Sequence, residues 1–133
     1  MEDLSHSTLT LLDYFFLIFH SVFTLFNILG WIWLKTRLAH LVTVLLTLFS
    51  WSVMGIWYGF GYCFLTDWHW DVRRVLGTPP NSNSYIHFLI QETIGLDLPI
   101  SWVDTGVTVV FSICFILSIA LNFRDYQRRK LKE

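Results

Sequence analysis

The sequence predicts an all-α membrane protein with three transmembrane helices, plus an amphipathic interfacial helix and a short half-length helix between the second and third spans. Of the 133 residues, 54% are hydrophobic and only 14% are charged, against roughly 25% charged in ordinary soluble domains. Three long stretches carry almost no charge, and each is long enough as a helix to cross a hydrocarbon core of about 30 Å. The many aromatic residues exclude a disordered chain, and the formal net charge of −1 does not favour nucleic acid as a partner.

The three predicted spans belong to a single membrane domain, residues 1–133, and comprise residues 9–34, 38–64 and 100–123. The first span contains one formally charged side chain, Asp13. The residues before it are acidic, whereas a cleavable signal peptide begins with basic residues. We therefore expect the first span to remain uncleaved.

The basic residues predict the orientation, because Lys and Arg are retained on the cytoplasmic side of a membrane. Most of them follow the first or the third span: Lys35, Arg37, Arg124, Arg128, Arg129, Lys130 and Lys132. The N-terminus is therefore expected outside and the C-terminus inside. Residues 65–99 then form an outer segment, where function is to be sought, and residues 124–133 form a cytoplasmic basic tail.

The outer segment is expected to begin with an amphipathic helix. Thr66 is the predicted N-cap, with Asp67 at the positive end of the helix dipole, and the helix is expected to end near Leu76. Apolar and charged side chains fall on different sides at helical spacing: Trp68, Val72, Val75 and Leu76 against Asp67, Asp71 and Arg74. We expect the helix to lie along the membrane interface, with Trp68 and Trp70 at headgroup level.

A second short helix is expected after a loop rich in glycine, proline and turn formers at residues 77–84. It is predicted to run from about Asn83 to Thr93 and to be closed by Gly95. Its length of about 17 Å is too short to cross a bilayer. The helix is therefore either interfacial or a half-helix packed against the spans.

Each span carries one partly polar face, which predicts the contact surface between the three helices. In the first span, Asp13, His20 and Asn27 are spaced by seven residues and share a face. In the third, Asp104 stands at the entrance of a similar face. Because ionisable side chains within a span are unfavourable unless they have a role, Asp13, His20 and Asp104 are candidate functional residues, together with His69. The alternative for the two carboxylates is that they reach water from one turn below the surface.

The side chains expected to line a ligand or partner surface lie near the outer membrane surface: Trp57, Tyr58, Cys63, Trp68, Trp70 and His87. A haem between His20 and His40 is disfavoured, because their depths differ by about 18 Å. No zinc-like spacing is present, so no metal site is assigned. Cys63 and Cys114 differ too much in depth to form a disulfide. Neither a GxSxG elbow nor an HExxH helix occurs, and no catalytic residue is assigned.

Several residues and short motifs follow one another along the chain in this order: His20, His40, Gly61-Tyr62-Cys63-Phe64-Leu65-Thr66, Val72-Arg73, a Gly/Pro linker and Tyr85-Ile86-His87-Phe88. In this order they resemble an uncharacterised family of small bacterial integral membrane proteins, the domain-of-unknown-function family 2784. Its members are similar in carrying Cys-Pro-Leu-Thr, then an acidic residue and Leu-Arg. Here Phe64 replaces the proline, and His69 stands where the acid is expected. The resemblance implies a similar helical arrangement in the bacterial cytoplasmic (inner) membrane, and it brings no reaction with it.

The function expected from these features is that of a non-catalytic small membrane subunit docking on a larger membrane protein complex. The alternative is a binding protein for a quinone, haem or lipid held between the spans beneath the outer helices. Its walls would be Trp57, Tyr58, Trp68 and His69. No cofactor is expected under the first hypothesis, whereas haem or quinone belongs to the second.

Overall fold

The computed structural model describes residues 3–58, 63–80 and 84–132, except for the side chains of Tyr58 and Phe64. In chain order the helices are α1 (His6–Leu29), α2 (Arg37–Phe49), α3 (Gly55–Tyr58), α4 (Phe64–Val75), α5 (Tyr85–Thr93) and α6 (Ile100–Lys132), with a 3-10 turn at Leu34–Thr36 and a π-helix at Ser50–Met54. No strand occurs in these ranges, which confirms the all-α prediction. Three helical stretches are long and apolar enough to cross a membrane, as predicted: His6–Leu29, Leu34–Trp57 and Ile100–Lys132.

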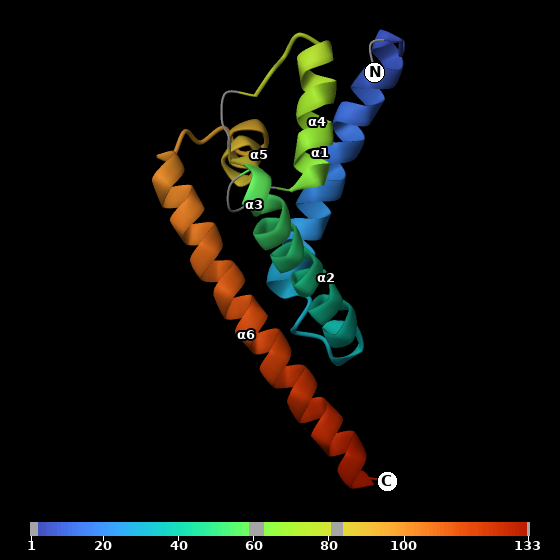
Figure 1. Cartoon of the computed structure of the whole chain (residues 1–133), viewed down its shortest axis with the longest axis vertical. Helices are drawn as coiled ribbons and strands as arrows, with labels where there is room; N and C mark the ends of the chain where they lie inside the picture. Colours follow the sequence, from blue (N-terminus) through green and yellow to red (C-terminus); the bar gives the residue numbers. More distant parts are fainter. Residues whose placement is uncertain (1–2, 59–62, 81–83, 133) are drawn as a thin grey trace.

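The three long stretches form the body of the molecule, and the two short helices pack at one end of it (Figure 1). α2 packs on α6, and α1 contacts both of them. α4 lies lengthwise along the N-terminal half of α1, and α5 contacts the beginning of α6 (Figure 1). α4 therefore follows the axis of the first candidate span, whereas the sequence predicted a helix in the membrane plane.

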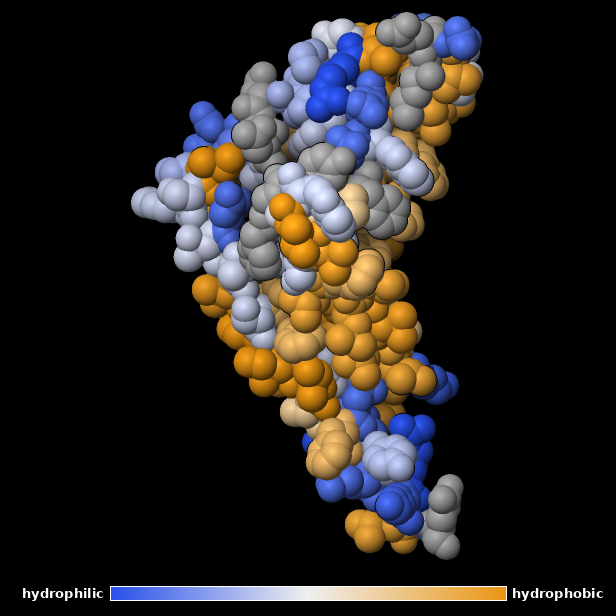
Figure 2. Space-filling view, viewed as in Figure 1, coloured by the Kyte–Doolittle hydropathy of each residue, from blue (hydrophilic) through white to orange (hydrophobic). Residues whose placement is uncertain are grey.

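The surface of the molecule matches the environment of a lipid bilayer. Figure 2 shows hydrophobic residues over the middle of the visible face and hydrophilic residues toward both ends. Large apolar side chains such as Leu11, Ile18 and Ile116 are well over half exposed. Such exposure is unfavourable in water and normal in a hydrocarbon layer.

The bounds of α1 differ from the predicted first span at both ends. The helix begins at His6, because the hydroxyl of Ser5 accepts a hydrogen bond from the Thr8 backbone N–H at 3.2 Å. It ends at Leu29, followed by Gly30. A Cβ at Gly30 would lie 3.0 Å from the His40 ring and 2.7 Å from a backbone oxygen. The glycine therefore permits α2 to approach the end of α1 closely.

The other two spans also differ from prediction at their C-terminal ends. The second was expected to reach residue 64, but Cys63 is extended (φ −128, ψ 130) and Phe64 already belongs to α4, while residues 59–62 lie outside the described ranges. The third begins at Ile100, as predicted, and continues to Lys132. The basic tail is therefore a helical extension of the span.

The predicted N-cap at Thr66 is wrong. α4 begins three residues earlier, with Cys63 at the cap position and no side-chain cap hydrogen bond. Leu65, inside the helix, packs on the cluster of Leu9, Phe16 and Val72 that joins α4 to α1. Burying a leucine contributes about 1.5–3 kcal/mol, whereas a threonine cap contributes about 1 kcal/mol. Apolar packing therefore determines where this helix begins.

The face that α4 turns toward α1 also differs from the predicted apolar face. Trp68 is 51% exposed, whereas Val72, His69 and Trp70 are buried. The prediction grouped Trp68 with Val72 because both are apolar. The structure turns the helix so that His69 faces inward, where it finds polar partners.

Helix α5 ends as predicted and begins slightly later. Its first residue is Tyr85, and the Ser84 hydroxyl accepts from the His87 backbone N–H at 3.4 Å. Gly95 follows the helix with a φ of +82°, and its N–H donates to the Ile90 carbonyl at 3.0 Å. This conformation favours glycine and closes the helix.

A buried hydrogen-bond network joins all three spans near the α1–α2 connection. His40 is fully buried, and its Nε2 donates to the Asn27 carbonyl oxygen at 2.7 Å. Its Nδ1 lies 3.0 Å from the Ser118 hydroxyl of α6. The Asn122 amide donates to the carbonyl oxygens of Ser118 at 2.7 Å and Arg37 at 3.0 Å. The predicted polar faces therefore do form helix contacts at this end.

Candidate functional site

The polar side chains of α1, α4 and α5 meet in one group, which we call the polar cluster: Asp13, His20, His69, Arg73, Tyr85 and Glu92. His69 is at its centre. Its Nε2 lies 2.6 Å from Asp13 Oδ1, and its Nδ1 lies 2.7 Å from the Tyr85 hydroxyl. Because a carboxylate only accepts, Nε2–H donates to Asp13, and the Tyr85 hydroxyl donates to Nδ1 of the neutral ring.

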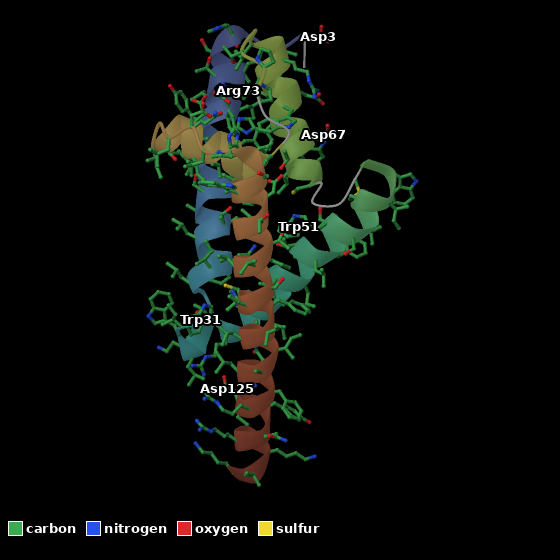
Figure 3. All side chains as sticks on the ribbon, turned by 90° about the vertical axis from the view of Figure 1, so that its left-hand side faces the viewer. Asp3, Trp31, Trp51, Asp67, Arg73 and Asp125 are labelled. Carbon is green, nitrogen blue, oxygen red and sulfur yellow. The ribbon has the colours of Figure 1, made fainter. Side chains whose placement is uncertain are left out.

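Arg73 holds the other side of the Asp13 carboxylate. Its Nη1 donates to both oxygens of Asp13, at 3.2 and 3.3 Å. Its Nε donates to the Thr78 carbonyl oxygen at 3.0 Å, and its Nη2 lies 3.7 Å from Glu92. The guanidinium also stacks 4.7 Å from the centre of the Phe88 ring. Figure 3 shows Arg73 on α4 among the side chains of α1 and α5. One cation thus connects three helices and the following loop.

His20 completes the cluster on the side toward the middle of α1. Its Nδ1 donates to the Phe16 carbonyl oxygen at 3.0 Å, and its ring centre lies 4.1 Å from that of Tyr85. The Nε2 atom is buried and has no hydrogen-bond partner among the described residues. Two positions of the predicted polar face of α1, Asp13 and His20, therefore face protein, as expected.

Burial determines the protonation state of the cluster. It lowers the pKa of His69 below 6.5, and the nearby Asp13 carboxylate opposes this effect. Burial also raises the pKa of the Tyr85 phenol above its ordinary value of 10.0. At neutral pH the imidazole and the phenol are therefore uncharged, and the Arg73 cation faces the Asp13 carboxylate.

Aromatic rings pack against the cluster. The Trp70 ring stacks on Tyr85 at 5.1 Å and meets Phe88 edge-on at 5.0 Å, while Phe16 stacks on His69 at 5.5 Å. The cluster chiefly fastens α4 and α5 to α1, because its hydrogen bonds run between these helices.

Acidification is expected to weaken this fastening. Because burial lowers the pKa of His69 from 6.5, its contribution to stability is complete above about pH 6.5 and is lost as the pH falls through the folded-state pKa. The titratable groups facing the ring are Asp13, His20, Arg73, Tyr85 and Glu92. The midpoint temperature of thermal unfolding in mild detergent should therefore decrease when the pH is lowered from about 7.5 to about 5.5. The decrease in unfolding temperature should be smaller in His69→Asn than in the wild-type protein. An equal decrease in the two proteins would contradict the role of His69 in this pH dependence.

The predicted aromatic surface residues do not come together. Trp57 and Trp68 are 70% and 51% exposed, whereas Trp70 is buried beside the cluster. Cys63 is half-buried, and Tyr58 lies outside the described side chains. His87 is buried, and its Nε2 donates to the Leu98 carbonyl oxygen at 2.7 Å, which ties α5 to the segment before α6.

No metal site forms within the described ranges, where no three His, Cys, Asp or Glu side chains gather suitably. Cys63 and Cys114 are both free. His40 bonds to Ser118 and lies at the other end of α1 from His69.

Asp104 lies apart from the cluster, beside a hollow between α2 and α6 that we call the α2–α6 cleft. The cleft has a volume of about 300 Å³ and is lined by Leu48, Trp51, Thr108, Phe111, Ser112, Phe115 and Ile116. A second hollow of about 280 Å³ adjoins it at Thr108 and is lined by Asp104, Thr105, Thr108 and Val109. Trp51, labelled in Figure 3, packs against Phe111 of α6 with ring centres 4.7 Å apart.

Sequence reasoning missed Arg73, Tyr85 and Glu92 as members of the cluster. Arg73 and Tyr85 stand within the motifs that carry the family resemblance, which was the available signal. No such signal was present for Glu92, because a single acidic residue near the end of a short helix is normally exposed to solvent.

Comparison with known proteins identifies the family and no closer relative. The model of the family described as Protein of Unknown function (DUF2784) matches residues 10–123, which cover most of the three candidate spans and all residues of the polar cluster. No curated protein and no solved structure matches the chain. The chain therefore belongs to this uncharacterised family.

Proposed function

We propose that this family member is a non-catalytic small integral membrane subunit that docks on a larger membrane protein through the α2–α6 cleft. The observation that carries the proposal is Asp104. Its side chain is exposed about one turn into a spanning helix, and it forms no ion pair or hydrogen bond with the described part of the chain. A carboxylate in this position is unfavourable against lipid and favourable against a cation.

The rest of the face favours close approach of a second helix. Thr108 donates to the Asp104 backbone carbonyl at 2.9 Å, and Ser112 donates to the Thr108 carbonyl at 2.8 Å. These hydroxyls are satisfied within their own helix, so they form a smooth surface of small side chains. The occupant we propose is a spanning helix of the partner that carries Lys or Arg at the depth of Asp104.

The proposed orientation follows the distribution of basic residues, with the N-terminus outside and the C-terminus inside the bacterial cytoplasmic membrane. α4 and the N-terminal half of α1 extend beyond the start of α6 (Figure 1). This position supports an outer surface formed by amphipathic α4 and half-length α5, with Trp68 exposed toward the headgroups.

An embedded quinone, haem or lipid is the second candidate for the α2–α6 cleft. A volume of about 300 Å³ is at the lower end of the range for ligand pockets, and Trp51 and Phe111 would provide aromatic walls. The place first expected for such a ligand, beneath the outer helices, contains the packed rings of Tyr85 and Trp70 instead. An absorption spectrum and lipid extraction of the purified protein would detect the ligand.

The docking proposal can be tested by site-specific photocrosslinking in native membranes. A photoreactive amino acid replaces Ser112, which lines the cleft, or Ile113, which is 53% exposed outside it. We expect one discrete crosslinked protein from position 112 and none from position 113. The crosslink should be lost when Asp104 is also changed to asparagine, because the partner's cation then has no counter-charge.

Two results would overturn the proposal. One is a crosslink from position 112 to lipid or to a second copy of the chain alone. The other is a protein crosslink that persists unchanged with Asp104→Asn or that forms equally from position 113.

A further inference from the structure

The last part of α6 is a basic helix that continues the third span. α6 has 33 residues and is therefore about 50 Å long, against about 30 Å for the hydrocarbon core and 40–45 Å for a bilayer with its headgroups. The apolar part, residues 100–123, fills about 36 Å of this length. Residues 124–132 must then run through the headgroup layer, and we call them the basic end of α6.

The basic end of α6 carries cations without counter-charges. Its only acid, Asp125, lies 3.0 Å from Arg37 of α2 and 3.6 Å from Arg124. The remaining basic side chains of this corner are exposed and form no ion pair with the described residues: Lys35, Arg128, Arg129, Lys130 and Lys132. The corner therefore has a strong positive excess.

Helical spacing gathers four of the basic side chains of α6 on one side, whereas Lys130 lies on the opposite side. Arg124, Arg128 and Lys132 are four residues apart and lie in line along the helix, and Arg129 lies one turn beyond Asp125. Because Asp125 faces Arg37, this side turns toward the α1–α2 connection. Figure 1 shows the basic end projecting past that connection. We call the side formed by Arg124, Arg128, Arg129 and Lys132 the basic face of α6.

We propose that the basic face of α6 binds the phosphate of an anionic phospholipid headgroup. Arginine forks match phosphate oxygens in charge and geometry, and basic clusters directly beside a span attract anionic lipids. The basic end emerges from the apolar part of the same helix, so the acyl chains of the lipid lie along α6. Phe123 and Tyr126, both more than half exposed, lie at the same level on the other side of α6, where aromatic side chains favour the membrane interface.

The site can be tested with the purified full-length chain by native mass spectrometry. The protein is mixed with equal amounts of phosphatidylglycerol and phosphatidylcholine. We expect phosphatidylglycerol to be retained in at least about tenfold preference. The triple variant Arg128→Gln, Arg129→Gln, Lys132→Gln should lose this preference, whereas Arg128→Lys with Arg129→Lys should keep most of it. Arg74→Gln, which removes an exposed cation elsewhere, serves as the control and should change nothing.

The source of the phosphate is distinguished by competition with a large excess of inorganic phosphate. Persistence of the lipid complex supports the proposal, and complete displacement would identify a free-phosphate site instead. Equal retention of both lipids, or unchanged preference in the triple variant, would overturn the proposal. Because the three replaced side chains are exposed, the triple variant should unfold at the wild-type temperature.

Discussion

Replacing Asp13 with asparagine is expected to lower the free energy of unfolding by about 2–3 kcal/mol. The amide oxygen can still accept from His69, but Arg73 loses the carboxylate that it contacts at 3.2 and 3.3 Å. Only 13% of the Arg73 side chain is exposed, so water replaces the lost partner incompletely. Equilibrium unfolding in mild detergent measures the change. The loss should be accompanied by faster hydrogen exchange in α4 and α5, which the cluster fastens to α1.

Asp71→Asn is the matched control, because Asp71 is also an acid paired with an arginine. It pairs with Arg74 on the exposed side of α4, where such pairs contribute about 0–1 kcal/mol. If Asp13→Asn and Asp71→Asn were equally mild, the cluster would not fasten α4 and α5 to α1. Arg73→Gln extends the test, because the double variant with Asp13→Asn should lose less than the sum of the single variants.

The sequence alone could not predict the contact between Asp13 and Arg73. The two residues are 60 positions apart, and no local spacing relates them. The polar face of α1 was predictable, since residues seven apart share a helical face. Which groups this face meets depends on how α4 is rotated, and that rotation follows from packing around Leu9 and Phe16.

The number of spans was predictable because length and hydropathy alone limit what can cross a bilayer. Helix ends were less predictable. At Thr66 a capping preference was outweighed by the burial of Leu65 in the cluster with Val72. Beyond Phe123 the charged sequence suggested a tail, but Asp125 binds Arg37 of α2. That ion pair ties the chain beyond the span to α2, and α6 continues to Lys132.

The second large effect is expected at His40, for which the sequence analysis disfavoured a role as a haem ligand. His40→Ala should lower the free energy of unfolding by about 3 kcal/mol, chiefly because it leaves a cavity where three spans meet. The wild-type ring is fully buried and lies against Gly30. The variant also leaves the Asn27 carbonyl oxygen without the donor that it has at 2.7 Å.

Comparison with Ser118→Ala separates the packing role of His40 from its hydrogen bonds. Ser118→Ala removes the 3.0 Å bond to His40 Nδ1 and the 3.5 Å bond that the hydroxyl accepts from the Asn122 amide within α6. Hydrogen bonds between membrane helices contribute about 0.6 kcal/mol on average. We therefore expect His40→Ala to be several times more destabilising than Ser118→Ala in thermal unfolding of the detergent-solubilised protein. His40→Phe keeps a ring of similar size and removes both hydrogen bonds, so it should fall between the two. If His40→Phe were as damaging as His40→Ala, the hydrogen bonds would dominate, and the ring would not act mainly by filling the space among α1, α2 and α6.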